Sequence, residues 1–189
     1  MIRSLTAIVI ALLMMGALAL PAQADTITSS GTLTGTTTLT PTADPAVFDS
    51  SFTGNGVDIV SGDFTAMNTG TITFTSSTAF TVSGTFTDVF AGGTFLGTFT
   101  GSGTVTGADT SVTTLDATIT GATGSFAGDT GESTITGTNT TTSSTTSSVS
   151  ETYTTSITTP EPGSLALLLV GIGFLPLMRR RLARGPQAS

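Results

Sequence analysis

The residues with the clearest potential for chemistry are aspartates in glycine-rich stretches. The segment TGNGVDIVS, residues 53–61, differs at one position from the calcium-binding nonapeptide G-G-x-G-x-D-x-U-x, and Asp58 would be its ligand. Such loops bind calcium by stacking adjacent turns, so the motif needs tandem copies, and the sequence has one. We therefore expect an ordinary Asn55-Gly56 turn that leads into a strand, and no bound metal. Asp58 is the single candidate for a calcium ligand.

Paired carboxylates are the groups that most glycosidases use for hydrolysis. Two pairs are available by spacing, Asp58 with Asp63 and Asp109 with Asp116. The chain contains no His, Cys or Lys, so it lacks the commonest general base and a thiol nucleophile. Aspartate is also a common residue in the glycine-rich turns of β-hairpins. We expect a non-enzymatic protein without a cofactor; a hydrolase is the alternative, and it would lose activity when one pair is mutated.

The charge of the chain is strongly segregated. All five basic residues are arginines in the terminal segments, whereas residues 25–159 contain nine Asp, two Glu and no cation, a formal charge of −11. A purely acidic body has no means of holding phosphates, which excludes nucleic acid as a partner. The absence of cysteine excludes a disulfide framework.

The elements that must position these aspartates are short strands. Threonine makes up about a quarter of the chain and favours extended backbone. Apolar residues alternate with Thr or Ser over residues 70–76, 80–90, 94–105 and 115–121, the pattern of half-buried strands. We predict an all-β domain over residues 25–137, a small antiparallel sandwich or barrel with a thin phenylalanine core and with glycines at turns and bulges.

One hairpin supports the barrel. Residues 117–134 are similar to the Gly-Thr-Gly-x-Phe-x-Gly hairpin of dirigent and allene oxide cyclase-like β-barrels, with residues 123–128 as its centre. The similarity covers a single hairpin and carries no catalytic residue. A closed barrel would also remove exposed sheet edges.

Residues 138–159 are nearly all Thr and Ser. So few apolar residues cannot offset the loss of chain entropy, and we predict a disordered, flexible stalk that resembles O-glycosylated stalks. Asn139 begins an Asn-Thr-Thr sequon and is a candidate for N-glycosylation.

The N-terminus has the three parts of a secretory signal peptide. Arg3 precedes an apolar run, and Ala22-Gln23-Ala24 forms a small-residue cleavage site. We expect signal peptidase to cleave after Ala24, the end of a signal peptide over residues 1–24, once the Sec machinery has exported the chain. An uncleaved N-terminal membrane anchor is the alternative.

The C-terminus joins three features in order: Pro160-Glu161-Pro162, an apolar run over residues 165–178, and Arg179, Arg180 and Arg181. The apolar run would be about 21 Å long as a helix. That is short for a hydrocarbon core about 30 Å thick, which suggests a transient transmembrane helix. Because positive residues stay on the cytoplasmic side, the arginines would retain the C-terminus inside.

These three features, over residues 160–189, resemble the PEP-CTERM sorting signal of bacterial exported proteins. The resemblance implies that exosortase, a membrane transpeptidase-like cysteine enzyme, cuts at or near the Pro-Glu-Pro triplet and removes the helix and the basic tail. It also implies a surface or extracellular-matrix protein, frequently glycosylated, in bacteria that make exopolysaccharide. A plain single-span anchor is the alternative.

Together these features predict a non-enzymatic exported protein. It would lie transiently in the cytoplasmic membrane and then at the cell surface or outside the cell, with exopolysaccharide as a partner. The alternative is a carbohydrate- or ice-binding module that uses the threonine-rich strand face, although an ice-binding array needs a flat lattice.

Overall fold

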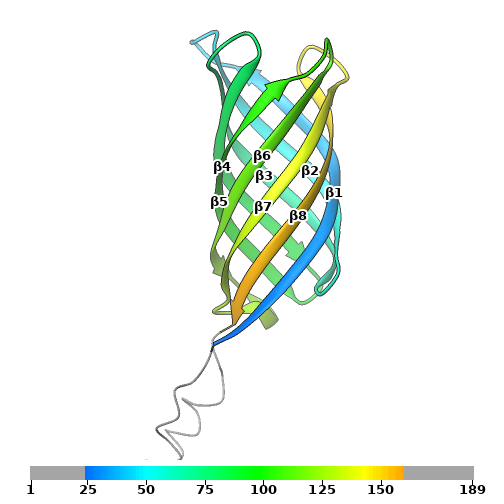
Figure 1. Cartoon of the computed structure of the whole chain (residues 1–189). Coiled ribbons are helices and arrows are strands. Elements are labelled where there is room, and N and C mark those ends of the chain that lie inside the picture. Colours follow the sequence, from blue (N-terminus) through cyan, green and yellow to red (C-terminus); the bar gives the residue numbers. More distant parts are fainter. Residues whose placement is uncertain (1–23, 160–189) are drawn as a thin grey trace, which may run out of the picture. The chain divides into compact units, whose positions relative to one another are not determined.

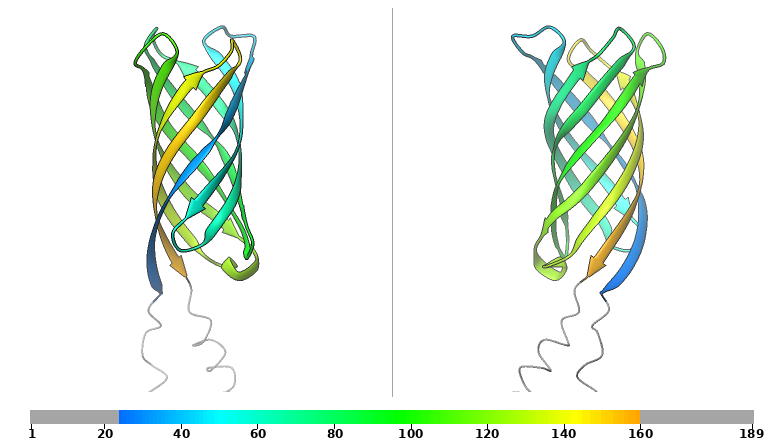
Figure 2. Two further views of the ribbon diagram at one scale, coloured as in Figure 1. Left: turned by 90° about the vertical axis from the view of Figure 1, so that its right-hand side faces the viewer. Right: turned by 60° about the vertical axis from the view of Figure 1, so that its left-hand side comes forward.

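Alternating threonine and apolar residues form eight β-strands in the computed structural model, which describes residues 24–159 (Figure 1). The strands are β1 (Asp25–Pro41), β2 (Val47–Asp58), β3 (Gly62–Phe74), β4 (Ala79–Phe90), β5 (Gly93–Val105), β6 (Thr110–Ala122), β7 (Thr130–Thr141) and β8 (Thr146–Thr159). Each strand pairs antiparallel with the next one along the chain, and the sheet closes into a barrel. The all-β prediction is confirmed, and of its two architectures the structure has the barrel, as the two further views also show (Figure 2).

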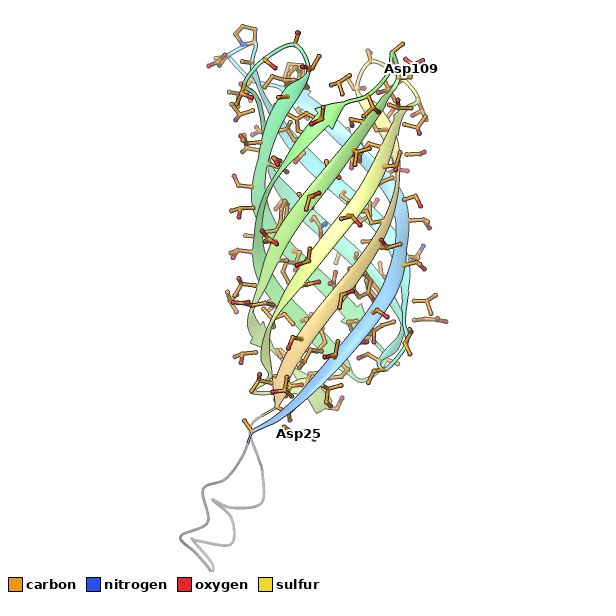
Figure 3. All side chains as sticks on the ribbon, viewed as in Figure 1. Asp25 and Asp109 are labelled. Carbon is orange, nitrogen blue, oxygen red and sulfur yellow. The ribbon has the colours of Figure 1, made fainter. Side chains whose placement is uncertain are left out.

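The buried apolar side chains point into the lumen of the barrel, and the outer face carries mainly threonine and serine (Figure 3). Phe80, Phe95, Phe99, Leu115 and Ile119 are all buried, as the alternation in their strands predicts. An eight-stranded barrel has an interior that side chains can just fill, or that can hold one small ligand. This core is thin, because no large side chain of the described residues is completely buried.

Several glycines lie inside strands because phenylalanine rings occupy the space beside them. A Cβ atom at Gly56 would overlap the ring of Phe64, and one at Gly97 would overlap both the ring of Phe86 and the carbonyl oxygen of Thr118. The register of β5 and β6 shifts between Leu96 and Gly97, as expected for a glycine at a β-bulge. Small residues next to large ones are a common solution for filling a narrow barrel.

The predicted Asn55-Gly56 turn is wrong, because both residues lie within β2 and pair with β1. The chain reverses only after Asp58, at residues 59–61. Gly56 serves the packing of Phe64 and not a change of chain direction. The identity of the neighbouring ring, which belongs to another strand, could not be read from the local sequence.

The predicted flexible stalk over residues 138–159 is also wrong. This segment forms the end of β7 and all of β8, and it completes the barrel, so the β domain extends to Thr159. The strand needs few apolar residues because only alternate side chains face the lumen; Val149 and Ile157 are buried there. Backbone hydrogen bonds to β7 satisfy the strand along its length.

The four loops at one end of the barrel share a hydrogen-bond pattern. Each loop begins with a threonine whose Oγ1 donates to the carbonyl oxygen of the first residue of the next strand. The pairs are Thr42 with Val47, Thr75 with Ala79, Thr106 with Thr110, and Thr142 with Thr146, at 2.9, 3.2, 3.3 and 3.1 Å. Threonine hydroxyls therefore fix these turns as well as coating the strands.

The opposite end of the barrel is closed by the β6–β7 connection. Its short helix η1 (Gly124–Phe126) lies against the β4–β5 turn, where the backbone N–H and hydroxyl of Ser125 donate to the carbonyl of Gly92 at 2.8 and 3.0 Å. The ring of Phe126 lies 4.6 Å from that of Phe95 and 5.6 Å from that of Phe90, centroid to centroid. β1 begins and β8 ends at this same end (Figure 1).

Candidate functional site

The lumen contains two neighbouring cavities. One has a volume of about 250 Å³ and extends to the β5–β6 loop, where Asp109 forms part of its wall. The other, of about 70 Å³, lies toward the end that Phe90 and Phe95 help to close. Four residues line both cavities: Asn68, Phe99, Leu115 and Glu151. The lumen is therefore the principal candidate for a binding site.

Asp58 is the centre of a hydrogen-bond network beside the smaller cavity. Its Oδ1 accepts from the hydroxyl of Ser29 at 2.7 Å and from the backbone N–H groups of Val60 and Ser61 at 2.9 and 2.7 Å. Its Oδ2 accepts from the hydroxyl of Tyr153 at 3.0 Å. Burial opposes ionisation, but these hydrogen bonds outweigh it and hold the pKa of Asp58 below its ordinary value.

This network gives Asp58 a structural role. Its carboxylate already accepts four hydrogen bonds. Within residues 24–159, no group of three or more acidic side chains is arranged to hold a metal ion. The structure therefore does not assemble a ligand set around the single calcium candidate.

Asp88 on β4 and Glu151 on β8 place two further carboxyl groups in the lumen. Both line the smaller cavity, and neither forms a hydrogen bond with any other described residue. Burial raises the pKa of Glu151 to about 7, and burial together with the charge of Glu151 raises the pKa of Asp88 to about 7. The lumen can therefore gain or lose protons near neutral pH.

Asn68 on β3 lies between the two cavities. Its Oδ1 atom is buried and has no hydrogen-bond partner among the described residues. A buried amide oxygen without a donor is costly by roughly 1–3 kcal/mol. The lumen thus has an unsatisfied acceptor, and like the carboxyl of Glu151 it belongs to the lining of both cavities.

These lumen groups were missed in the sequence, although a signal existed. Asp88 has the same parity as Phe80, Val82 and Phe86, which are expected to face inward, so extending the alternation by one step places its carboxyl in the lumen. Glu151 lies between Val149 and Tyr153 in a segment whose Thr and Ser content obscures the alternation. Its inward position follows from the strand structure of β8, in which it has the same parity as the buried Val149.

The two carboxylate pairs suggested by spacing are not brought together. Asp58 is buried, whereas Asp63 is exposed at the start of β3. Asp109 lies in the β5–β6 loop at the rim, and Asp116 is exposed on the outer face of β6. Asp58 pairs with Gly62, the residue next to Asp63, so Asp58 and Asp63 face opposite sides of the sheet. Asp109 is at the rim and Asp116 is on the outer face, so neither pair forms a site.

Asn139 also departs from expectation. Its side chain lines the larger cavity, and its Nδ2 donates to Thr113 Oγ1 at 3.5 Å. A glycan on this nitrogen would have to occupy the lumen. The folded barrel therefore does not present Asn139 for N-glycosylation.

Of the other predicted site residues, Ala24 is the one that the structure describes. Ala24 is exposed and directly precedes β1. Ala22, the triplet Pro160-Glu161-Pro162, the apolar run 165–178 and the arginines 179–181 lie outside the described residues. Within residues 24–159 there is no helix with the length and hydrophobicity needed to cross a membrane.

The arrangement as a whole is an apolar lumen with polar groups that can accept hydrogen bonds and exchange protons. Pockets of this kind, mostly apolar with a few polar groups, are typical of small-molecule sites. No family model matches the sequence, and no curated protein or solved structure matches it either.

Proposed function

We propose that this chain is an exported, non-enzymatic surface or extracellular-matrix protein that exosortase processes at its Pro-Glu-Pro triplet. The observation that carries the proposal is that the whole barrel lies between the two expected processing sites. β1 begins at Asp25, directly after the expected signal-peptidase site, and the eighth strand that completes the barrel lies before the triplet, within residues 146–159. Removal of both terminal segments would leave the whole barrel intact.

The positions of β1 and β8 on the barrel also support the proposal. The first residues of β1 and the last residues of β8 lie at the same end of the barrel, so both processing events would take place at one end (Figure 1). The two cleavages would not involve the loops at the other end of the barrel, nor the cavity that extends to the β5–β6 loop there.

The outer face supports a location in a hydrated matrix. It carries rows of threonine, and neighbouring hydroxyls meet across strands at 3.2 Å between Thr69 and Thr85 and between Thr136 and Thr152. Hydroxyl groups both donate and accept hydrogen bonds, so such a surface is suited to contact with exopolysaccharide. These rows favour carbohydrate binding by the threonine face as a second candidate function; ice binding has less support because the rows follow a twisted, closed sheet.

The proposed lack of catalysis is supported by the groups in the lumen. Asp58 is held by four hydrogen bonds, and the described residues contain no His, Cys or Lys that could act with Asp88 or Glu151. The lumen thus resembles a site for binding more than a site for covalent chemistry.

Intact-mass measurement on the chain recovered from cells with and without exosortase tests the sorting proposal. With the enzyme present, we expect a species that has lost residues 1–24 and the segment after the triplet. Without the enzyme, the mass of residues 165–189 should be retained. Replacing Pro160, Glu161 and Pro162 by alanine should prevent the second cleavage, whereas the control Glu132→Ala, which changes an exposed residue of β7, should not.

The same masses separate the alternatives. A recovered chain that keeps residues 165–189 in the presence of exosortase contradicts sorting and favours a single-span anchor. A chain that keeps residues 1–24 favours an N-terminal anchor. A glycan array probed with the recovered protein tests the threonine face, and failure to bind any polysaccharide would remove the second candidate.

A further inference from the structure

Three acceptor groups in the lumen have no hydrogen-bond donor among the described residues. Asn68 Oδ1 is buried and accepts no hydrogen bond. The carboxyl groups of Glu151 and Asp88 have no hydrogen-bond partner among the described residues either. Ionised carboxylates and amide oxygens are acceptors only, so all three would be satisfied by a molecule that donates.

No positive charge within the barrel can meet this demand. Residues 24–159 contain no Lys, Arg or His, and the other titratable groups that face the lumen are Asp58 and Tyr153, with Asp109 at the rim. Tyr153 already donates its single proton to Asp58. A cation that balances the lumen carboxylates must therefore come from outside residues 24–159.

The larger cavity sets the size and polarity of the ligand. Its volume is about 250 Å³, and its wall includes Phe52, Phe74, Phe80 and Phe99. An apolar cavity of about 150 Å³ is enough to bind benzene, so a ring with a short side chain fits. Aromatic faces also attract cations, which favours a positively charged group close to the rings.

The cavity has a route of entry. It extends to Ala108 and Asp109, which are exposed in the β5–β6 loop. Asp109 lies at the end of the barrel opposite Asp25 (Figure 3). An acidic residue at this rim would raise the local concentration of cations, and Phe126 closes the other end with Phe90 and Phe95.

We propose that the lumen binds a small organic amine, with its ammonium group between Glu151 and Asn68 Oδ1 and its apolar body in the larger cavity. The ammonium group donates to the amide oxygen and to the carboxylate, and Asp88 adds negative charge from the smaller cavity. The phenylalanine walls bury the apolar body. This site is independent of how the protein is exported or processed.

The proposal makes binding depend on pH. An ammonium ion binds the ionised carboxylate, and the pKa values of Asp88 and Glu151 are raised to about 7 by burial. The amine itself stays protonated well above this range. Affinity is therefore expected to rise about tenfold from about pH 6 to about pH 8, with release of protons on binding.

Cyclohexylmethylamine and its neutral analogue cyclohexylmethanol test the site, because they have the same shape and differ in charge. Titration calorimetry on the purified chain measures both affinities. Fluorescence of Tyr153, the single tyrosine of a chain without tryptophan, reports changes in the lumen. We expect saturable binding of the amine at about pH 8, and binding of the alcohol at least about tenfold weaker, the factor that a loss of 1.4 kcal/mol produces.

Glu151→Gln keeps the shape of the side chain and removes its charge. It should lower the affinity for the amine at least about tenfold. The matched control is Asp116→Asn, an exposed carboxyl on the outer face, which should leave the affinity unchanged. If Glu151→Gln does not fold, the pH dependence of the wild-type affinity tests the role of the carboxylate.

Four outcomes would each overturn the proposal. They are equal binding of the amine and the alcohol, an affinity that does not change with pH, no saturable binding at millimolar amine, and equal binding of the amine and ammonium chloride.

Discussion

The hydroxyl of Tyr153 donates a hydrogen bond to Asp58 Oδ2 at 3.0 Å, which joins β8 to the end of β2. Ser29 of β1 donates to the other oxygen of the same carboxylate at 2.7 Å. The sheet closes where β8 meets β1, so Asp58 binds both strands of the closing seam. A residue that appeared to be a calcium candidate therefore stabilises the closure of the barrel.

Loss of the Tyr153 hydroxyl should weaken this closure. We expect Tyr153→Phe to lower the free energy of unfolding by about 2 kcal/mol, because hydrogen bonds to charged groups contribute about that much. Urea unfolding followed by circular dichroism measures the change. Thr98→Val is the control, because Thr98 is an exposed outer residue of β5 with no side-chain hydrogen bond to the described residues. This variant should leave the free energy of unfolding nearly unchanged. Equal stability of Tyr153→Phe and wild type would contradict the role of the network.

The barrel should become less stable as the pH rises through neutrality. Folding raises the pKa of Asp88 and Glu151 from 3.8 and 4.5 to about 7, so the folded state binds protons more tightly than the unfolded state between about pH 4 and pH 7. At low pH both carboxyls are protonated and their burial involves no charge. As the pH increases they ionise, and the buried charge lowers the free energy of unfolding. At about 1.4 kcal/mol per pKa unit, this cost reaches at most about 4 kcal/mol for Asp88 and about 3 kcal/mol for Glu151.

Urea midpoints measured from about pH 5 to about pH 8 test this dependence. The double variant Asp88→Asn/Glu151→Gln should flatten the profile, and Asp116→Asn should not. The lowered pKa of Asp58 acts in the opposite direction, with stability lost as the pH falls through that pKa, so its effect lies below this window. A wild-type midpoint that rises toward pH 8 would contradict the burial of the two lumen carboxyls.

Gly97 should tolerate no side chain. A Cβ atom there meets the backbone oxygen of Thr118 as well as the ring of Phe86, and the backbone cannot move without breaking the β5–β6 pairing. Gly97→Ala is expected to lower the free energy of unfolding by about 2 kcal/mol. Gly121→Ala provides the comparison, because the nearest atoms to a Cβ there lie at 3.9 Å. Similar stability of the two variants would contradict the packing argument.

Asn139 should carry no N-linked glycan. Its Nδ2 atom faces the lumen and is bonded to Thr113, so the folded barrel does not expose it to a transferase. Peptide mapping by mass spectrometry of the protein recovered from a glycosylating host measures occupancy. Threonines of the outer face, which are exposed, provide the internal comparison for O-linked sugars. A glycan found on Asn139 would contradict the inward orientation of this side chain.

Much of the fold was predictable because alternation is a local property. The pattern of Phe80, Val82 and Phe86 against intervening Thr and Ser depends only on neighbouring residues, and it gave the inward face of β4. The same reasoning failed over residues 138–159, because Thr and Ser there hid the alternation of Val149, Tyr153 and Ile157. Composition predicted disorder, but pairing with β7 and closure of the barrel stabilise the strand.

The sequence by itself determined the all-β class, the acidic and cation-free body, and the expected processing signals that flank it, since these depend on residue types and their order. Only the tertiary structure decided that the sheet closes, that Asp58 bonds to β1 and β8, and that Asp88, Glu151 and Asn68 share one lumen. Strands that are distant in the sequence bring these side chains together, and that pairing depends on register and closure. Alternation tells which way a side chain points, but not which side chains it meets.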